Sequence, residues 1–186
     1  MDVSRLRRMQ TIDTLLDGYS SLSVAKLLEP LAPDFHHQTL PESLGMPIRD
    51  RDAFAKHAEG VFGLFQEFKM IRKTVVDDAA AGIVVIDAQM LGTLTGGKGE
   101  WNNECVMMVR LTEDGSKVLD IREFVDSTKA IEMARRHAPE EFGGKATDTF
   151  NNREAGLFDW RVIDSDSWIH FGAAVIALIG LRRVFL

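Results

Sequence analysis

A single carboxylate lies in a stretch of residues 117–127, KVLDIREFVDS, whose other alternate residues are apolar. Leu119, Ile121 and Val125 share one parity of a period-two pattern, and Glu123 lies among them. Burial of an unpaired carboxylate is costly, so we expect Glu123 to be paired, neutral or facing a polar cavity. Apolar surroundings can also raise the pKa of a carboxyl group toward neutrality, which makes Glu123 a candidate general acid or base.

A histidine in the segment DFHHQTL, residues 34–40, is the second candidate. His37 shares its strand parity with Phe35, whereas His36 has the opposite parity and is predicted to be exposed. An imidazole with an unperturbed pKa of about 6.5 can exchange protons at cellular pH. His37 is therefore a candidate catalytic residue, and the alternative is a histidine that bonds to backbone at a strand end.

His57 lies beside the apolar side of a helix predicted over residues 50–66, three residues after Phe54. A histidine at the border of an apolar helical stripe is either a core residue with satisfied hydrogen bonds or a second proton-exchanging group. Phe54 belongs to the same apolar face, where it is a candidate substrate contact. The two histidines and Glu123 are the predicted catalytic residues.

An amide occupies the apolar parity of the strand predicted over residues 100–111. Asn103 alternates there with Trp101 and Met107, and these three residues are predicted to contact the substrate. The amide can orient a substrate or donate to a developing oxyanion, and the alternative is a bond to a bulge or turn. Glu104 has the opposite parity and is predicted to face solvent or a dimer surface, as a secondary site.

Asp126 directly precedes a predicted helix, so its expected role is a helix cap, and it is kept as a secondary site residue. Cys105 is the only cysteine, which excludes an intrachain disulfide and favours a reducing, intracellular setting. Because His36 and His37 point to opposite faces of a strand, we expect no metal site. We also expect no cofactor, since no phosphate-binding loop or dinucleotide fingerprint is present.

The periodicity of the apolar residues predicts that helices precede a long antiparallel meander. The predicted helices cover residues 6–18, 24–31, 50–66 and 128–137, and the predicted strands cover residues 34–40, 68–76, 82–94, 100–111 and 118–125. This order indicates an α+β domain in which helices cover one face of a curved antiparallel sheet. A strongly twisted sheet covered in this way becomes a cone.

The length of 186 residues allows one well-buried domain and a modest appendage. We assign residues 1–139 to this domain, 140–167 to a linker or loosely packed extension, and 168–186 to an apolar C-terminal helix. The last segment either packs against the domain or a partner, or contacts a membrane. It is short for a full anchor, because a bilayer span needs about 20 apolar residues. We expect a cytoplasmic protein, with peripheral or C-terminal membrane contact as the alternative.

Three segments resemble a fungal-type SnoaL-like protein of the nuclear transport factor 2-like superfamily: DFHHQTLPESLG, NNECVMMVRLTEDGSKV and DIREFVDS. The similarity extends over residues 11–137 and includes the helix that carries His57. It implies a cone-shaped fold and metal-free acid/base chemistry in a hydrophobic cavity, as in polyketide cyclases, ketosteroid isomerase, scytalone dehydratase and limonene epoxide hydrolase. In this resemblance, His37 matches the histidine of the family's D-x-x-H segment.

We derive two hypotheses for the function. The first is a cofactor-independent cyclase, isomerase or dehydratase of secondary metabolism that acts on a hydrophobic polyketide- or terpenoid-like intermediate, with Glu123 and His37 as the acid/base pair. The second is a non-catalytic ligand-binding or dimerisation module. A homodimer is expected in either case, and the net charge of −6 disfavours nucleic acid as a partner. An open cavity lined by His37, His57 and Glu123 favours the enzyme, whereas a cavity filled by side chains favours the module.

Overall fold

The computed structural model describes residues 3–137. The predictions for residues 140–167 and 168–186 therefore fall outside the described part of the chain. Within residues 3–137, no helix is long and apolar enough to span a membrane. The elements in chain order are α1 (Val3–Ser20), α2 (Val24–Leu28), β1 (Leu31–Leu40), η1 (Glu42–Leu44), β2 (Arg49–Asp50), α3 (Arg51–Phe62), β3 (Phe65–Asp78), β4 (Ile83–Leu94), η2 (Thr95–Gly97), β5 (Glu100–Leu111), β6 (Val118–Val125) and α4 (Ser127–His137).

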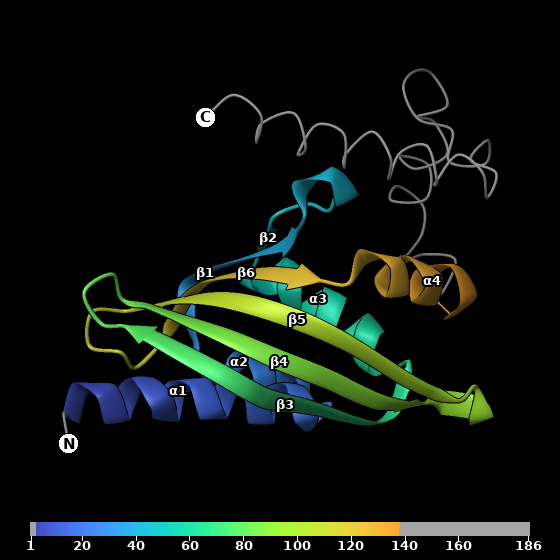
Figure 1. Ribbon diagram of the computed structural model, residues 1–186, viewed down its shortest axis with the longest axis horizontal. Coiled ribbons are helices and arrows are strands. Elements are labelled where there is room, and N and C mark those ends of the chain that lie inside the picture. The colour runs from blue at the N-terminus through green and yellow to red at the C-terminus, as the bar shows by residue number, and fades with distance from the viewer. Residues whose placement is uncertain (1–2, 138–186) are drawn as a thin grey trace, which may run out of the picture. The chain divides into compact units, whose positions relative to one another are not determined.

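A six-stranded curved and open sheet, in the order β2-β1-β6-β5-β4-β3, forms the centre of this unit (Figure 1). Strands β3 to β6 are the predicted antiparallel meander. β1 pairs with β6 in parallel, and the short β2 pairs with β1 in antiparallel orientation. The fold class is confirmed as α+β, with helices α1 to α3 on one face of the sheet (Figure 1). We call this covered face the inner face.

Helices α1 and α3 bury residues spaced three or four apart, which is the signature of one helical stripe facing a core. In α3 the buried residues are Phe54, Ala58 and Phe62. Asp50 caps this helix, since its Oδ1 accepts a 2.8 Å hydrogen bond from the amide of Ala53. The helix was predicted to reach residue 66, but it ends at Phe62, and Phe65 already belongs to β3.

The N-terminal helix is attached to the sheet by a buried ion pair. Arg8 donates to both carboxylate oxygens of Asp77, with distances of 2.9 Å from Nε and 2.8 Å from Nη2. At the other end of α1, a Cβ on Gly18 would lie 2.7 Å from the Cα of Leu27, so the glycine lets α1 and α2 approach closely. These contacts hold α1 against the sheet and against α2. They thereby position Tyr19, which lies in the last turn of α1.

Two strands differ from the prediction near a register shift: β1 in its starting residue, and β6 in the burial of its first residues, although the bounds of β6 are as predicted. β1 begins at Leu31, three residues before the predicted start, and includes Pro33. Proline has no N–H to donate to a neighbouring strand, and it is accommodated here because the pairing with β6 is irregular between Leu31 and His36. In β6, the register shifts opposite the end of β5, so the fully buried residue at this end is Val118, and Leu119 is only half-buried. The strand parity assumed for Leu119 was therefore wrong.

Candidate functional site

A cavity of about 280 Å³ lies on the inner face of the sheet. Most of its wall is apolar, formed by Met46, Phe54, Ala58, Val61, Phe62, Leu64, Phe65, Phe68, Met70, Met90, Val125, Ala130 and Met133. The polar side chains in the wall are Tyr19, His37, Thr39, His57, Trp101, Asn103 and Glu123. An apolar cavity with a few convergent polar groups is the usual form of a small-molecule site.

His37 and Glu123 form a pair in the cavity wall. The Nε2 atom of His37 lies 3.3 Å from Oε2 of Glu123, and the side chains are 2% and 13% exposed. Parallel pairing brings them together, because Thr39 is the register partner of Glu123 and His37 lies two residues before it on β1. His37 also packs against Phe54, with ring centroids 4.7 Å apart. The predicted acid/base residues are therefore in contact and almost fully withdrawn from water.

His57 approaches the pair from α3. Its ring centroid lies 6.5 Å from that of His37, with 26° between the ring planes. Burial, and then the positive charge of Arg49 and the proximity of His37, lower the pKa of His57 to about 3. At neutral pH its imidazole is uncharged, with one nitrogen that donates and one that accepts.

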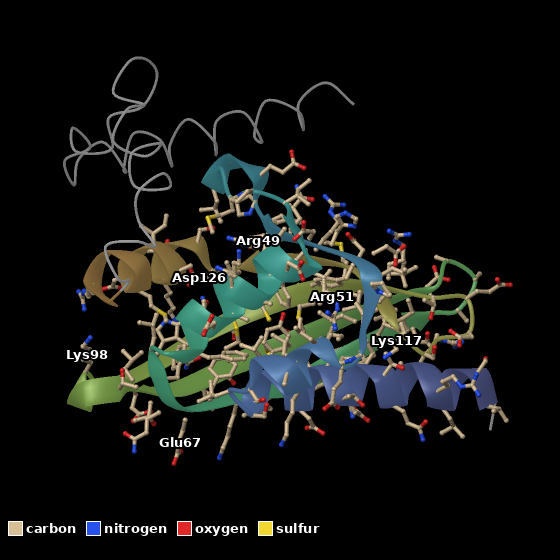
Figure 2. All side chains as sticks on the ribbon, turned by 180° about the vertical axis from the view of Figure 1, so that it is seen from behind. Arg49, Arg51, Glu67, Lys98, Lys117 and Asp126 are labelled. Atoms are coloured by element: carbon tan, nitrogen blue, oxygen red, sulfur yellow. The ribbon has the colours of Figure 1, made fainter. Side chains whose placement is uncertain are left out.

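A buried cation, Arg49, adjoins the pair and was not predicted from the sequence. Arg49 on β2 is the register partner of His37 on β1, and its Nη1 donates a 3.5 Å bond to the carbonyl of Pro47. Burial lowers the pKa of Arg49, while the carboxylate of Glu123 opposes this effect. Figure 2 shows Arg49 next to the start of α3. Nothing in the surrounding residues PIRD marks this arginine as buried, because its burial depends on the pairing of β2.

Three buried polar atoms of the wall have no hydrogen-bond partner within the described residues: the hydroxyl of Tyr19, Nδ1 of His37 and Nε1 of Trp101. Such atoms are rare in folded proteins, and a bound ligand is one way to satisfy them. Burial, followed by the proximity of Glu123 and Cys105, raises the pKa of Tyr19 well above its ordinary value. Tyr19 therefore remains a donor at neutral pH. No periodic pattern in the sequence separates Tyr19 from the ordinary residues at a helix end.

The amide of Asn103 lines the cavity but is bonded mainly to backbone. Its Oδ1 accepts a 2.8 Å bond from the amide of Glu104, and its Nδ2 donates a 3.4 Å bond to the carbonyl of Asp126. The Nδ2 group carries a second N–H, which neither of these bonds uses and which can donate to a substrate. Met107, a predicted substrate contact, is the register partner of Glu123 on the neighbouring strand, but it is fully buried in the core and does not line the cavity.

The two secondary candidates lie away from the cavity wall. Glu104 is exposed and forms a 2.8 Å ion pair with Lys73. Asp126 caps α4, because its Oδ1 accepts a 3.0 Å bond from the amide of Thr128 (Figure 2). Cys105 is buried, and burial raises the pKa of its thiol, so it has none of the properties of an activated thiolate. Within residues 3–137, no cluster of His, Cys, Asp and Glu has an arrangement suited to a metal ion.

Comparison with known sequences finds distant relatives in fungal biosynthesis. No family model matches the chain. Monooxygenase dmxR10 of Cryptosporiopsis sp. (strain 8999) is 25% identical over 117 residues, which are 63% of this chain and 78% of the relative. Austinoid biosynthesis cluster protein J of Aspergillus calidoustus is 28% identical over 144 residues, which are 73% of this chain and 83% of the relative.

Solved structures share the fold at low sequence identity. PrhC of Penicillium brasilianum NBRC 6234 has a TM-score of 0.67 and 19% identity, covering 78% of this chain and 97% of its own. BvnE pinacolase of Penicillium brevicompactum has a TM-score of 0.66 and 16% identity, covering 71% and 94%. A SnoaL-like polyketide cyclase from Jannaschia sp. CCS1 has a TM-score of 0.57 and 16% identity, covering 72% and 94%. At these identities the likeness establishes the fold alone.

Proposed function

We propose that this chain, which has the nuclear transport factor 2-like fold of SnoaL-like proteins, is a cofactor-independent acid/base enzyme of secondary metabolism. It acts as a cyclase, isomerase or dehydratase on a hydrophobic polyketide- or terpenoid-like intermediate. The observation that carries the proposal is the contact between His37 and Glu123 in the wall of an apolar cavity. A paired carboxylate and imidazole, held away from water next to space for a substrate, form an acid/base unit.

Glu123 is the base in this proposal. Its carboxylate takes a proton from a carbon next to a substrate carbonyl, and the electrons of the broken C–H bond move to the carbonyl oxygen as an enolate. Return of the proton to another carbon gives an isomer, and attack of the enolate carbon on a second carbonyl closes a ring. Loss of a β-hydroxyl group, which is protonated as it leaves, releases water in the dehydratase alternative. His37 positions the carboxylate and shares the transferred proton through the 3.3 Å contact.

The enolate oxygen needs donors that are already in place. Tyr19 supplies one, because its buried hydroxyl has no partner within residues 3–137 and stays protonated at neutral pH. His57 is a second candidate, since its imidazole is neutral and its ring is close to that of His37. The remaining N–H of Asn103 is a third. We therefore assign the pair to proton transfer and these residues to stabilisation of the oxygen.

The relatives support the biosynthetic setting and raise a second candidate function. Two of them are named as austinoid biosynthesis cluster proteins and one as an ergochrome gene cluster protein. Several others are named monooxygenases. The second candidate reaction for this chain is therefore oxidation of a substrate CH₂ group to a carbonyl by O₂. One oxygen atom enters the product and the other leaves as water with the two hydrogens of the CH₂ group, so the substrate itself supplies the electrons.

Mass spectrometry of products separates these reactions. We would incubate the full chain with extracts of its native pathway, under normal and isotopically labelled O₂. Cyclisation and isomerisation leave the substrate mass unchanged, and dehydration removes one water. A product that carries labelled oxygen from O₂ would instead establish the monooxygenase alternative and overturn the proposal.

Substitution of the pair tests the assignment of residues. Glu123→Gln and His37→Ala should each lower turnover by about 100-fold or more, because general acid/base catalysis contributes about 10² to 10⁴ in rate. Glu104→Gln is the matched control, since Glu104 is an exposed carboxylate outside the cavity. Circular dichroism and thermal unfolding of each variant verify that the fold is retained. Wild-type turnover in both cavity variants would contradict the proposal.

The non-catalytic module remains the structural alternative. In that case the cavity binds a ligand without converting it, and Glu123 serves as a hydrogen-bonding residue of the fold. Glu123→Gln would then lower the thermal stability, and the wild-type protein would return the extracted ligand unchanged. The open cavity, which is lined by His37, His57 and Glu123, supports the enzyme over the module.

A further inference from the structure

Trp101, a residue of the cavity wall, has a buried hydrogen-bond donor for which the described residues supply no acceptor. Its Nε1 atom is buried and has no partner within residues 3–137, and the residue lines the cavity wall. An indole N–H donates only, so its missing partner must be an acceptor. In a cavity whose wall is mostly apolar, the acceptor expected from a ligand is an oxygen atom.

The indole ring is held in place by packing. Its centroid lies 5.5 Å from that of Phe65, at 59°, and 6.3 Å from that of Phe68, at 29°. Gly92 on β4 is the register partner of Trp101, and a Cβ on this glycine would lie only 2.5 Å from the ring of Phe65. The glycine thus leaves the space that Phe65 occupies beside the indole. The direction of the N–H is fixed before any ligand binds, which lowers the entropic cost of using it.

The donor is remote from the acid/base pair. Trp101 lies four residues before Cys105 on β5. The thiol of Cys105 is close enough to the carboxylate of Glu123 to interact with it electrostatically. Four residues of an extended strand span roughly 13 Å. The wall between these positions includes Met90, which offers no hydrogen bond, and Asn103, whose amide is bonded mainly to backbone. A ligand that contacts both ends is therefore elongated.

We infer that the N–H of Trp101 binds a second oxygen of the substrate, at the end of the molecule opposite to the carbonyl that reacts. The inference rests on the proposed function for the identity of the reacting end. It specifies the substrate class as an elongated, mostly hydrocarbon skeleton with an acceptor oxygen at each end. Trp101 is then a specificity-determining residue that sets which carbon atoms lie next to Glu123.

A pair of probes of the same shape tests this inference without turnover. The probes are 2,6-diacetylnaphthalene, with a carbonyl at each end, and 2,6-diisopropenylnaphthalene, in which each carbonyl oxygen is replaced by a CH₂ group. The readout is the indole N–H signal of Trp101 in ¹H–¹⁵N correlation spectra of the full chain. The chain has three tryptophans, and the signal that is missing in Trp101→Phe assigns Trp101.

The diketone should move the Trp101 N–H signal downfield, and about tenfold of its preference over the hydrocarbon should come from the hydrogen bond to Trp101. Trp101→Phe keeps an aromatic ring against Phe65 and Phe68, and it should lower this preference by about tenfold. The hydrocarbon should bind Trp101→Phe and the wild type with the same affinity, within about threefold.

An unmoved Trp101 signal at saturation with the diketone would overturn the inference, as would an equal preference for the diketone in Trp101→Phe. The same titration on Glu123→Gln separates this result from the proposed function. If the Trp101 signal moves there while turnover is lost, both proposals stand. If it moves while Glu123→Gln keeps wild-type turnover, only the acid/base assignment fails.

Discussion

His57 differs from a surface histidine because its surroundings oppose a positive charge. Burial, the charge of Arg49 and the proximity of His37 lower its pKa to about 3, compared with about 6.5 in an unfolded chain. Between these two values the unfolded state binds a proton that the folded state does not. The free energy of unfolding therefore rises with pH through this window. Acid destabilises the fold partly by protonating His57 in the unfolded chain.

The first prediction concerns this pH dependence. His57→Gln removes the titrating group, so the free energy of unfolding of the variant should fall less steeply than that of the wild type between pH 6.5 and about 4. The difference in slope should approach about 1.4 kcal/mol per pH unit, the value for one proton. Urea unfolding at several pH values measures it. Parallel curves for the two proteins would contradict a lowered pKa of His57.

The second prediction concerns the source of the shift. Arg49→Met removes the positive charge and keeps most of the buried aliphatic stem, so the pKa of His57 should rise above about 3. Arg49→Lys keeps the charge and should leave the shift mostly in place. Arg51→Met is the matched control on the neighbouring residue, whose Nη2 donates to the carbonyl of Leu28. NMR titration of the imidazole protons measures these values, and equal shifts in both Met variants would contradict the role of Arg49.

At the scale of single residues, strand parity located His37 and Glu123 because a polar residue among alternating apolar ones is visible in the chain itself. Parity could not show Arg49, whose burial results from the pairing of a two-residue strand. It also could not show Tyr19, which reaches the cavity through the position of α1 on the sheet. Asn103 was correctly predicted on the inner face, but its bonds to backbone depend on the end of β6.

Among the elements, α4 has the most direct effect on the cavity, because Ala130 and Met133 form part of the wall. The first turn of this helix is bonded to Asp126, whose carboxylate accepts from Thr128 and whose carbonyl accepts from Ala130. Asp126 was expected to be a cap, and its hydrogen bonds agree with that role. The carboxylate therefore influences the site by holding a wall, not by contacting a substrate.

The third prediction follows from this cap. Asp126→Ala should destabilise α4 by about 1 kcal/mol, because amides of its first turn lose their acceptor. Asp126→Asn retains a capping oxygen, so its loss of stability should be only a few tenths of the loss in the Ala variant. Hydrogen exchange of the amides of Thr128 and Lys129 reports the change locally, with faster exchange expected in the Ala variant. Equal protection in the two variants would indicate that the cap does not hold the helix.

The elements that were predicted well are those formed by neighbouring segments of the chain. Short turns between β3, β4, β5 and β6 allowed only antiparallel pairing, and the meander was correct. The end of α3 was placed too late because Phe65 continues the apolar spacing of the helix while its backbone has already entered β3. The fold class and the likeness to SnoaL-like proteins are confirmed, whereas the parallel pairing of β1 with β6 had no local signal.

At the scale of the molecule, the sheet has a second face that the described helices do not cover (Figure 1). Val106 and Phe124 are register partners on β5 and β6. They alternate along their strands with residues of the inner face, so they lie on the outer face, where they are 40% and 47% exposed. Adjacent exposed apolar side chains on a sheet are a common feature of protein interfaces. We propose that this face joins two copies of the chain, as expected from the sequence.

The fourth prediction tests this dimer. Val106→Asp combined with Phe124→Asp should reduce the solution mass from that of two chains to that of one, because an interface cannot bury unpaired charges cheaply. Ile48→Asp is the control, since Ile48 is 63% exposed but lies outside the sheet strands. Sedimentation equilibrium at several concentrations measures the mass. A monomeric wild-type protein at tens of micromolar would contradict the proposal.

The parallel pairing of β1 with β6 also determines when the site exists during folding. His37 and Glu123 are 86 residues apart in the chain, and closing a flexible loop of that length costs about 4 kcal/mol of entropy. The hairpins from β3 to β6 close much shorter loops and can form first. A chain that had folded only this far would carry Glu123 on an edge strand, without its imidazole. The acid/base pair thus assembles when β1 docks, so a competent site and a completed fold arise together.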